Sequence, residues 1–130
     1  MSALPLWQAL LFVAAGSVPG AVLGYLSNIV ALKLWGARFP WATLTVNVVG
    51  CFLAGMVLAL ALRGQLSESS RLFWMVGFLG ALTTFSAFSA ETLGLLQAAH
   101  YFTAGLNIGL NVVLSLVAVV FGHWLLRETL

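Results

Sequence analysis

The sequence predicts an all-α membrane protein with four transmembrane helices. Hydrophobic residues make up 62% of the 130-residue chain and charged residues only 6%, whereas soluble domains carry about 25% charged residues. The mean hydropathy is +1.11, so the chain has too little polar surface to cover a water-soluble core. Charges and turn-forming residues divide the chain into apolar stretches, each long enough to cross a bilayer.

These stretches are residues 4–34, 43–62, 72–98 and 101–126, and we expect one transmembrane domain over residues 1–130. About 20 helical residues cross the roughly 30 Å hydrocarbon core. Pro40 precedes the second stretch and serines precede the third, as is typical of helix starts. The connections are short and leave no room for a soluble domain.

The first and fourth stretches carry small residues at close-packing spacing. Gly16, Gly20 and Gly24 form two GxxxG steps, and Gly105 with Gly109 forms another. Such glycines let helix backbones approach closely in membranes. Packing within one subunit and packing across a dimer interface both explain them.

Neutral polar residues form stripes on the second and fourth stretches. Thr43 and Asn47 are four residues apart, and Asn107, Asn111 and Ser115 repeat at the same spacing. Polar groups in hydrocarbon need partners. The stripes therefore indicate either hydrogen bonds between helices or a narrow polar path.

The third stretch contains GALTTFSAFSAET at residues 80–92. A glycine and two β-branched threonines near its middle favour a broken helix. A break frees backbone carbonyls, which suit a hard cation such as sodium. A glycine packing notch, with the threonines bonded to the preceding turn, is the alternative.

Two aromatic rings follow this break, because Phe85 and Phe88 share a helix face at i, i+3 spacing, beside a second face with Ser86 and Ser89. Such a pair is usually core packing. The positive edge of an aromatic ring can also meet a small anion in a dry site.

The positive charges are divided almost evenly between the two expected sides. Arg63, Arg71 and Arg127 lie on one side, and Lys33 and Arg38 on the other. Topology follows the Lys and Arg bias, so this near-even division permits insertion in both orientations, from which an antiparallel dimer would form. A weak bias is also common in small membrane proteins that insert in one orientation. The net charge of +2 is too small and scattered to indicate nucleic-acid binding.

Two motifs resemble the Fluc family of fluoride channels, also called CrcB proteins. GFLGALTTFSAFSAE at residues 77–91 is similar to that family's third-helix signature, and TLTVNVVGCFLAG at residues 43–55 to its second-helix pattern. The resemblance covers essentially the whole chain. It implies a passive fluoride channel in the bacterial inner or plasma membrane that protects the cell from fluoride toxicity, with two pores in an antiparallel dual-topology dimer surrounded by lipid.

The resemblance also implies roles for individual residues. Asn47 is expected to donate its amide to fluoride, Phe85 and Phe88 to present ring edges, and the carbonyls of Gly80 and Thr83 from both subunits to hold a structural sodium ion. The full set expected along the fluoride pathway is Thr43, Asn47, Phe85, Ser86, Phe88, Asn111 and Ser115.

The chain departs from the family pattern at two positions. GAVLGY at residues 20–25 has Gly24 where the family usually has an arginine, and Ala81 replaces the second glycine beside the expected sodium site. The missing arginine leaves open whether the dimer partner is a second copy or a paralogous subunit.

Other functional classes lack the residues they need. A small multidrug proton antiporter needs a carboxylate in its first helix, and this helix has none. An accessory assembly protein would explain the glycines but not the two motifs. An enzyme is not expected, because His100 and His123 lie near span ends on different helices, with no acidic or cysteine partner arranged for metal binding or nucleophilic catalysis.

Overall fold

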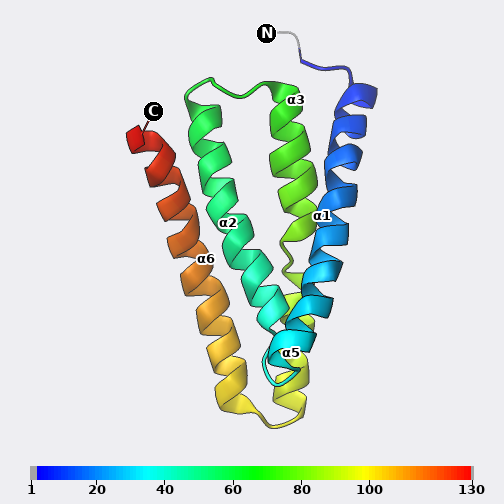
Figure 1. Cartoon of the computed structure of the whole chain (residues 1–130), viewed down its shortest axis with the longest axis vertical. Coiled ribbons are helices and arrows are strands. Elements are labelled where there is room, and N and C mark those ends of the chain that lie inside the picture. Colours follow the sequence, from blue (N-terminus) through cyan, green and yellow to red (C-terminus); the bar gives the residue numbers. More distant parts are fainter. Residues whose placement is uncertain (1–2, 130) are drawn as a thin grey trace.

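The computed structural model describes residues 3–129, and the regular elements in that range are all helices (Figure 1). The stretches long and apolar enough to cross a membrane are Leu6–Trp35, Trp41–Leu62, Glu68–Gln97 and Tyr101–Arg127. The expectation of an all-α protein with four such helices is therefore confirmed. Residues 1, 2 and 130 of the expected domain lie outside the described residues.

Three of the helix starts differ from the predicted ones. The first span begins at Leu6, after Pro5, rather than at residue 4. Helix α2 (Trp41–Leu62) begins directly after Pro40 rather than at residue 43. The third span begins at Glu68 rather than at residue 72, because the Ser67 hydroxyl accepts a hydrogen bond from the Ser70 amide at 3.2 Å. This cap extends the helix into polar residues that hydropathy alone excludes.

The third span is assembled from several short helices. These are α3 (Glu68–Arg71), the π-helix η1 (Leu72–Leu79), α4 (Gly80–Leu82) and α5 (Ser86–Gln97). Thr83 is extended, with φ −78° and ψ 149°. The predicted break near the middle of this span is confirmed, and it lies after Gly80, which is itself helical.

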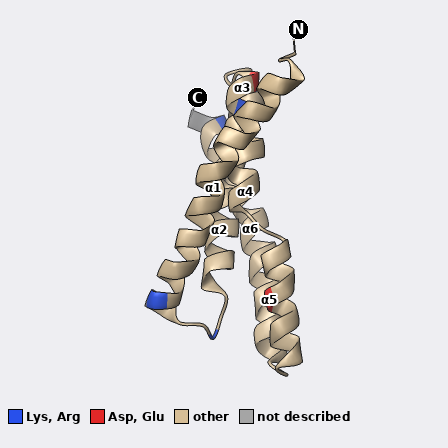
Figure 2. Ribbon diagram, turned by 90° about the vertical axis from the view of Figure 1, so that its right-hand side faces the viewer, with Lys and Arg blue, Asp and Glu red and all other residues tan. Residues whose placement is uncertain are grey.

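The bundle places both termini and the α2–α3 connection at one end, and the α1–α2 and α5–α6 connections at the other (Figure 1). Helix α1 (Leu6–Trp35) packs on η1, and α2 packs along α6 (Tyr101–Thr129). Lys and Arg residues lie toward the two ends (Figure 2).

Glycines explain the close packing of α1. Gly16 and Gly20 are buried, and a methyl group on either would collide with the backbone of Phe73 or Phe78. These two glycines therefore pack within the subunit. Gly105 and Gly109 on α6 are exposed, and a methyl group on either would meet no atom within 4 Å, so their stripe remains available to a second molecule.

The buried core lies beside the break, where Val46 of α2 meets Leu79 and Leu82. Most other large apolar side chains are exposed on the outside of the bundle, including Leu6, Phe102 and Val120. Apolar side chains are at home against lipid or another apolar subunit, so this exposure fits a membrane environment.

Candidate ion pathway

The side chain of Asn47 forms hydrogen bonds with the backbone at the break in the third span. Its Oδ1 atom accepts a hydrogen bond from the Thr84 amide at 2.8 Å, and its Nδ2 atom donates to the Thr84 carbonyl at 3.1 Å. One side-chain amide thus satisfies both backbone groups of a residue that has left the helix. Because backbone groups at membrane depth must find protein partners, Asn47 stabilises the broken conformation.

The break redirects two backbone amides. In a regular helix, the amides of Thr84 and Ala87 donate to the carbonyls of Gly80 and Thr83, four residues earlier. Here the Thr84 amide donates to Asn47, and the Ala87 amide donates to Thr84 Oγ1 at 3.1 Å. The Gly80 and Thr83 carbonyls thus lack their helical donors. The Thr83 hydroxyl itself donates to the Leu79 carbonyl in the preceding turn at 2.8 Å. The alternative expectation, that the threonines bond to the preceding turn, therefore holds for Thr83.

A continuous series of side-chain hydrogen bonds runs from Asn47 to the buried Thr92. Asn47 Nδ2 donates to Asn111 Oδ1 at 3.0 Å, and Asn111 Nδ2 donates to both the carbonyl and the Oδ1 atom of Asn107 at 2.9 Å. Asn107 Nδ2 donates to Thr92 Oγ1 at 3.0 Å, and Thr92 donates to the Phe88 carbonyl at 2.7 Å. Three asparagines from two helices therefore form one hydrogen-bonded unit.

An open groove of about 370 Å³ lies between α2, the break and α6. Phe85 and Phe88 flank it with ring centroids 5.5 Å apart and planes inclined by 55°. Phe88 is 9% exposed, whereas Phe85 is 78% exposed and lies within the break. The residues lining the groove are Asn47, Cys51, Thr83, Thr84, Phe85, Phe88, Asn111, Val112, Ser115 and Leu116.

Ser115 provides a further polar group in the groove. Its Oγ atom is buried and has no hydrogen-bond partner among the described residues. Serine hydroxyls in helices usually donate to the carbonyl four residues earlier. Ser115 therefore carries an unpaired hydroxyl among the residues that line the groove.

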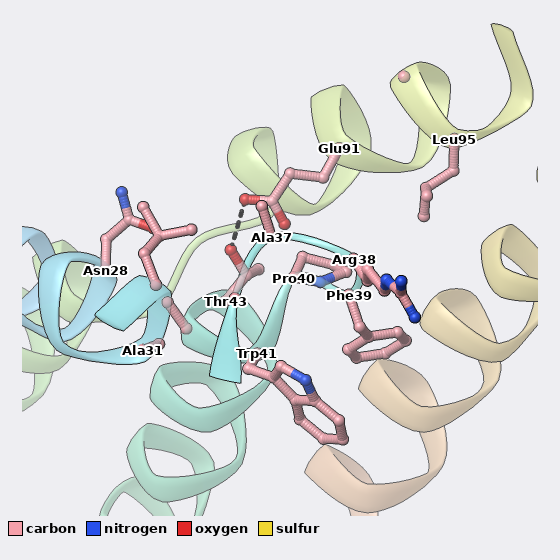
Figure 3. A pocket seen from close by; sticks show the side chains of 14 residues that line it. Asn28, Ala31, Ala37, Arg38, Phe39, Pro40, Trp41, Thr43, Glu91 and Leu95 are labelled. Carbon is pink, nitrogen blue, oxygen red and sulfur yellow. Dashed lines mark hydrogen bonds between the residues drawn. The ribbon is translucent and has the colours of Figure 1, made fainter. Parts of the chain in front are cut away.

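Thr43 lies one turn before Asn47 on α2, and its hydroxyl donates to Glu91 Oε1 at 2.7 Å (Figure 3). This pair lines two cavities. One, of about 270 Å³, lies under the α1–α2 connection with Arg38, and the other, of about 310 Å³, reaches Thr84. Thr84 also lines the Asn47 groove, so polar residues continue from the Arg38 end of the bundle to Asn47.

The structure brings most of the predicted pathway residues together. Five of them line one groove: Asn47, Phe85, Phe88, Asn111 and Ser115. Thr43 belongs to the neighbouring cavities, and Ser86 lies outside the groove, with its hydroxyl 3.2 Å from Thr84 Oγ1.

Sequence reasoning missed Thr84 and Thr92, which bond to the asparagines. The signal for Thr92 was its position four residues after Phe88, because a threonine at this spacing can return its hydroxyl to that carbonyl. Thr84 gave a weaker signal, as the second of two adjacent threonines.

The described part of the chain contains no cluster of three or more His, Cys, Asp or Glu side chains. Carbonyl oxygens, such as those of Gly80 and Thr83 at the break, are ligands that suit hard cations.

Comparison with known proteins decides the family. The model of the CrcB-like protein family, described as Camphor Resistance (CrcB), matches residues 11–123. The chain belongs to the CrcB-like family. The fluoride-specific ion channel FluC of Shewanella amazonensis is 48% identical to it over 116 residues, which are 89% of this chain and 94% of that protein. The proteins of the same name from Shewanella denitrificans and Shewanella loihica are each 47% identical over the same shares.

Membership of the CrcB-like family confirms two expectations from the sequence. The relatives are ion channels, a family that is not enzymatic. Together with the spans Leu6–Trp35, Trp41–Leu62, Glu68–Gln97 and Tyr101–Arg127, this makes the chain a multi-pass protein of the cell membrane.

Proposed function

We propose that this chain forms a fluoride-selective channel that exports fluoride passively and so protects the cell. Relatives that are almost half identical over nearly their whole length are named fluoride-specific ion channels. Fluoride enters acidified cells as the neutral weak acid and is trapped inside as the anion. A passive path down its gradient is then sufficient, and no energy source is required.

The groove at Asn47 carries this proposal. Fluoride is small and strongly hydrated, so a selective path must replace its water with convergent hydrogen-bond donors. The groove is lined by the Asn47 amide, by Ser115 with its unpaired hydroxyl, and by the rings of Phe85 and Phe88. The two Asn47 protons are held by the Thr84 carbonyl and by Asn111, so Asn47 would have to exchange one of these bonds to donate to the ion. All of these groups are neutral, so they can attract the anion without holding it too tightly to release.

The open shape of the groove supports a dimer. Phe85 is mostly exposed beside it, and Gly105 and Gly109 leave part of α6 free to approach another helix. A second subunit seated against this side would enclose the groove, and a twofold axis in the membrane plane would create two pores lined by both subunits. The other apolar faces would contact lipid.

The even distribution of charge supports an antiparallel arrangement. Arg63 and Arg71 lie at the end of the bundle that also holds the C-terminal part of α6, whereas Lys33 and Arg38 lie at the opposite end (Figures 1 and 2). Neither end has a strong excess of positive charge, so insertion in both orientations is compatible with the topology rule.

The carbonyls of Gly80 and Thr83 fit a structural sodium ion. Their helical donors are engaged by Asn47 and by the Thr84 hydroxyl, and Gly80 is exposed on the outside of the subunit. The same two carbonyls from a second subunit could complete the set of ligands. A bound cation would neutralise the partial negative charge of these oxygens where the subunits meet.

The test is ion efflux from liposomes that contain the purified protein, with a potassium ionophore to remove the membrane voltage. We expect rapid loss of fluoride, retention of chloride and no coupled proton movement. The absence of fluoride efflux from folded protein would contradict the proposal.

Two substitutions test the groove itself. Phe85→Ile and Phe88→Ile should lower fluoride efflux without changing assembly, because they remove the polarised ring edges. Phe102→Ile is the matched control, since Phe102 is 82% exposed on α6 and lies outside the groove. Normal efflux in both groove variants would remove the phenylalanines from the pathway.

A further inference from the structure

The side-chain amides of the Asn47 groove have no donor to spare. Both protons of Asn47 Nδ2 are donated within the protein, to the Thr84 carbonyl at 3.1 Å and to Asn111 Oδ1 at 3.0 Å. Both protons of Asn111 Nδ2 are donated to oxygen atoms of Asn107 at 2.9 Å. A primary amide carries two N–H donors and no more. An ion that enters the groove therefore has to find its donors elsewhere, unless it breaks these hydrogen bonds.

Two other side chains that line the groove keep their donors. The Thr83 hydroxyl donates to the preceding turn, and the Thr84 hydroxyl shares a hydrogen bond with that of Ser86. Ser115 differs, because its Oγ atom is buried and has no hydrogen-bond partner among residues 3–129. Cys51 also lines the groove, and its thiol makes no hydrogen bond within the same range. A hydroxyl is a good donor to an anion, and a thiol is a weaker one.

Cys51 and Ser115 lie in the same turn of the contact between α2 and α6, which run side by side in the same direction (Figure 1). In the turn before them, the Asn47 and Asn111 side chains are joined by a hydrogen bond of 3.0 Å. In the turn after them, the two backbones are in contact, because a methyl group on Gly55 would collide with a carbonyl oxygen of α6. The thiol and the hydroxyl therefore face the same part of the groove, between these two contacts.

We propose that fluoride is held between Cys51 and Ser115, whose thiol and hydroxyl donate hydrogen bonds to it. This inference rests on the proposed function and names the place in the groove where the ion is bound. A buried hydroxyl without an acceptor costs free energy, and a bound anion supplies that acceptor. The rings of Phe85 and Phe88 line the same groove and add their positive edges. The ion then passes without opening the hydrogen bonds by which Asn47 stabilises the break.

The thiol makes this site measurable, because Cys51 is the single cysteine of the chain. The purified protein in liposomes is treated with methyl methanethiosulfonate. The Cys51 thiolate attacks the sulfenyl sulfur of the reagent, a disulfide forms and methanesulfinate leaves. Fluoride bound against the sulfur disfavours the reactive thiolate, so we expect saturating fluoride to slow labelling about fivefold and equal chloride to leave it unchanged. Mass spectrometry measures the labelling rate. Labelled protein should also lose fluoride efflux, because the added methylthio group fills the site.

Two control variants and one site variant separate a local effect from a general one. Gln65→Cys combined with Cys51→Ser keeps a donor in the groove and places the thiol in the exposed α2–α3 connection, where fluoride should not slow labelling. Ser115→Ala removes the other donor, so the fluoride concentration that halves the labelling rate of Cys51 should rise about fivefold, equivalent to about 1 kcal/mol. Ser27→Ala removes a hydroxyl that donates to the Leu23 carbonyl on α1 and should leave that concentration unchanged.

The labelling result separates this inference from the proposed function. Equal labelling rates of Cys51 with and without fluoride would overturn the site, as would an unreactive Cys51 in the folded protein. Equal protection of Gln65→Cys, or an unchanged fluoride requirement in Ser115→Ala, would overturn it too. Protection of Cys51 without any fluoride efflux by the unaltered chain refutes the channel and leaves the site standing. Efflux without protection refutes the site alone.

Discussion

Exchanging one atom of Asn47 tests whether the groove depends on a donor at that position. Asn47→Asp preserves the size of the side chain and the Oδ1 acceptor for the Thr84 amide. It replaces Nδ2 by an oxygen, which then faces Thr84 O and Asn111 Oδ1 at the present separations of 3.1 and 3.0 Å. Two donated hydrogen bonds become two contacts between acceptors.

The expected effect on the ion is large. Membrane hydrogen bonds contribute about 0.6 to 1.7 kcal/mol each, so losing two costs about 1 to 3 kcal/mol of local stability. An ionised carboxylate about 4 Å from an anion adds about 4 kcal/mol of repulsion at an effective dielectric constant near 20. This repulsion corresponds to roughly a thousandfold loss of fluoride occupancy at 1.4 kcal/mol per tenfold.

Fluoride efflux from liposomes at neutral pH measures this effect directly, with size-exclusion chromatography to check the fold. Gln65→Glu is the control, because it makes the same amide-to-carboxylate change in the exposed α2–α3 connection. A folded Asn47→Asp protein that carries fluoride within about tenfold of the unaltered rate would refute the donor role, since the charge term alone exceeds that difference.

Four further substitutions test the packing around the pathway. A methyl group on Gly50 would collide with Thr83 Cγ2, so Gly50→Ala should lower stability by about 1 to 3 kcal/mol, and adding Thr83→Ser should restore it in thermal unfolding. Gly16→Ala should lower stability by a similar amount, because the added methyl group would collide with the backbone of Phe73. Gly105→Ala should leave the subunit stable, because the added methyl group meets no atom. Loss of the crosslinked dimer in Gly105→Ala would therefore indicate that a second subunit contacts this position. Thr43→Val removes the hydrogen bond to a half-buried carboxylate and should lower stability by about 1 to 3 kcal/mol; an unchanged unfolding midpoint would show that water replaces the hydroxyl.

The sequence predicted the helices well because hydropathy and helix-start signals are local. The spans followed from apolar runs, and the broken third span from Gly80 and the threonines after it. The amide partners could not be predicted in the same way. That Thr84 bonds to Asn47 depends on how α2 lies against the break, and no spacing within one helix encodes that contact.

The aromatic pair shows a second limit of periodic reasoning. The i, i+3 rule assumes an unbroken helix, but Phe85 lies in the break and only Phe88 lies inside α5. The two rings still meet, although one is exposed and the other buried. Similarly, GxxxG spacing could not show that Gly16 packs within the subunit while Gly105 remains exposed, because both patterns read alike along the chain.

The shared use of the Thr84 amide links the two proposed ion sites thermodynamically. When Asn47 holds this amide, the Gly80 carbonyl is free for a cation; when Asn47 releases it, the amide can return to that carbonyl. A cation that favours the open carbonyl therefore also favours the present orientation of Asn47. By reciprocity, the factor by which the Asn47 bond raises the affinity for the cation equals the factor by which the bound cation stabilises that bond.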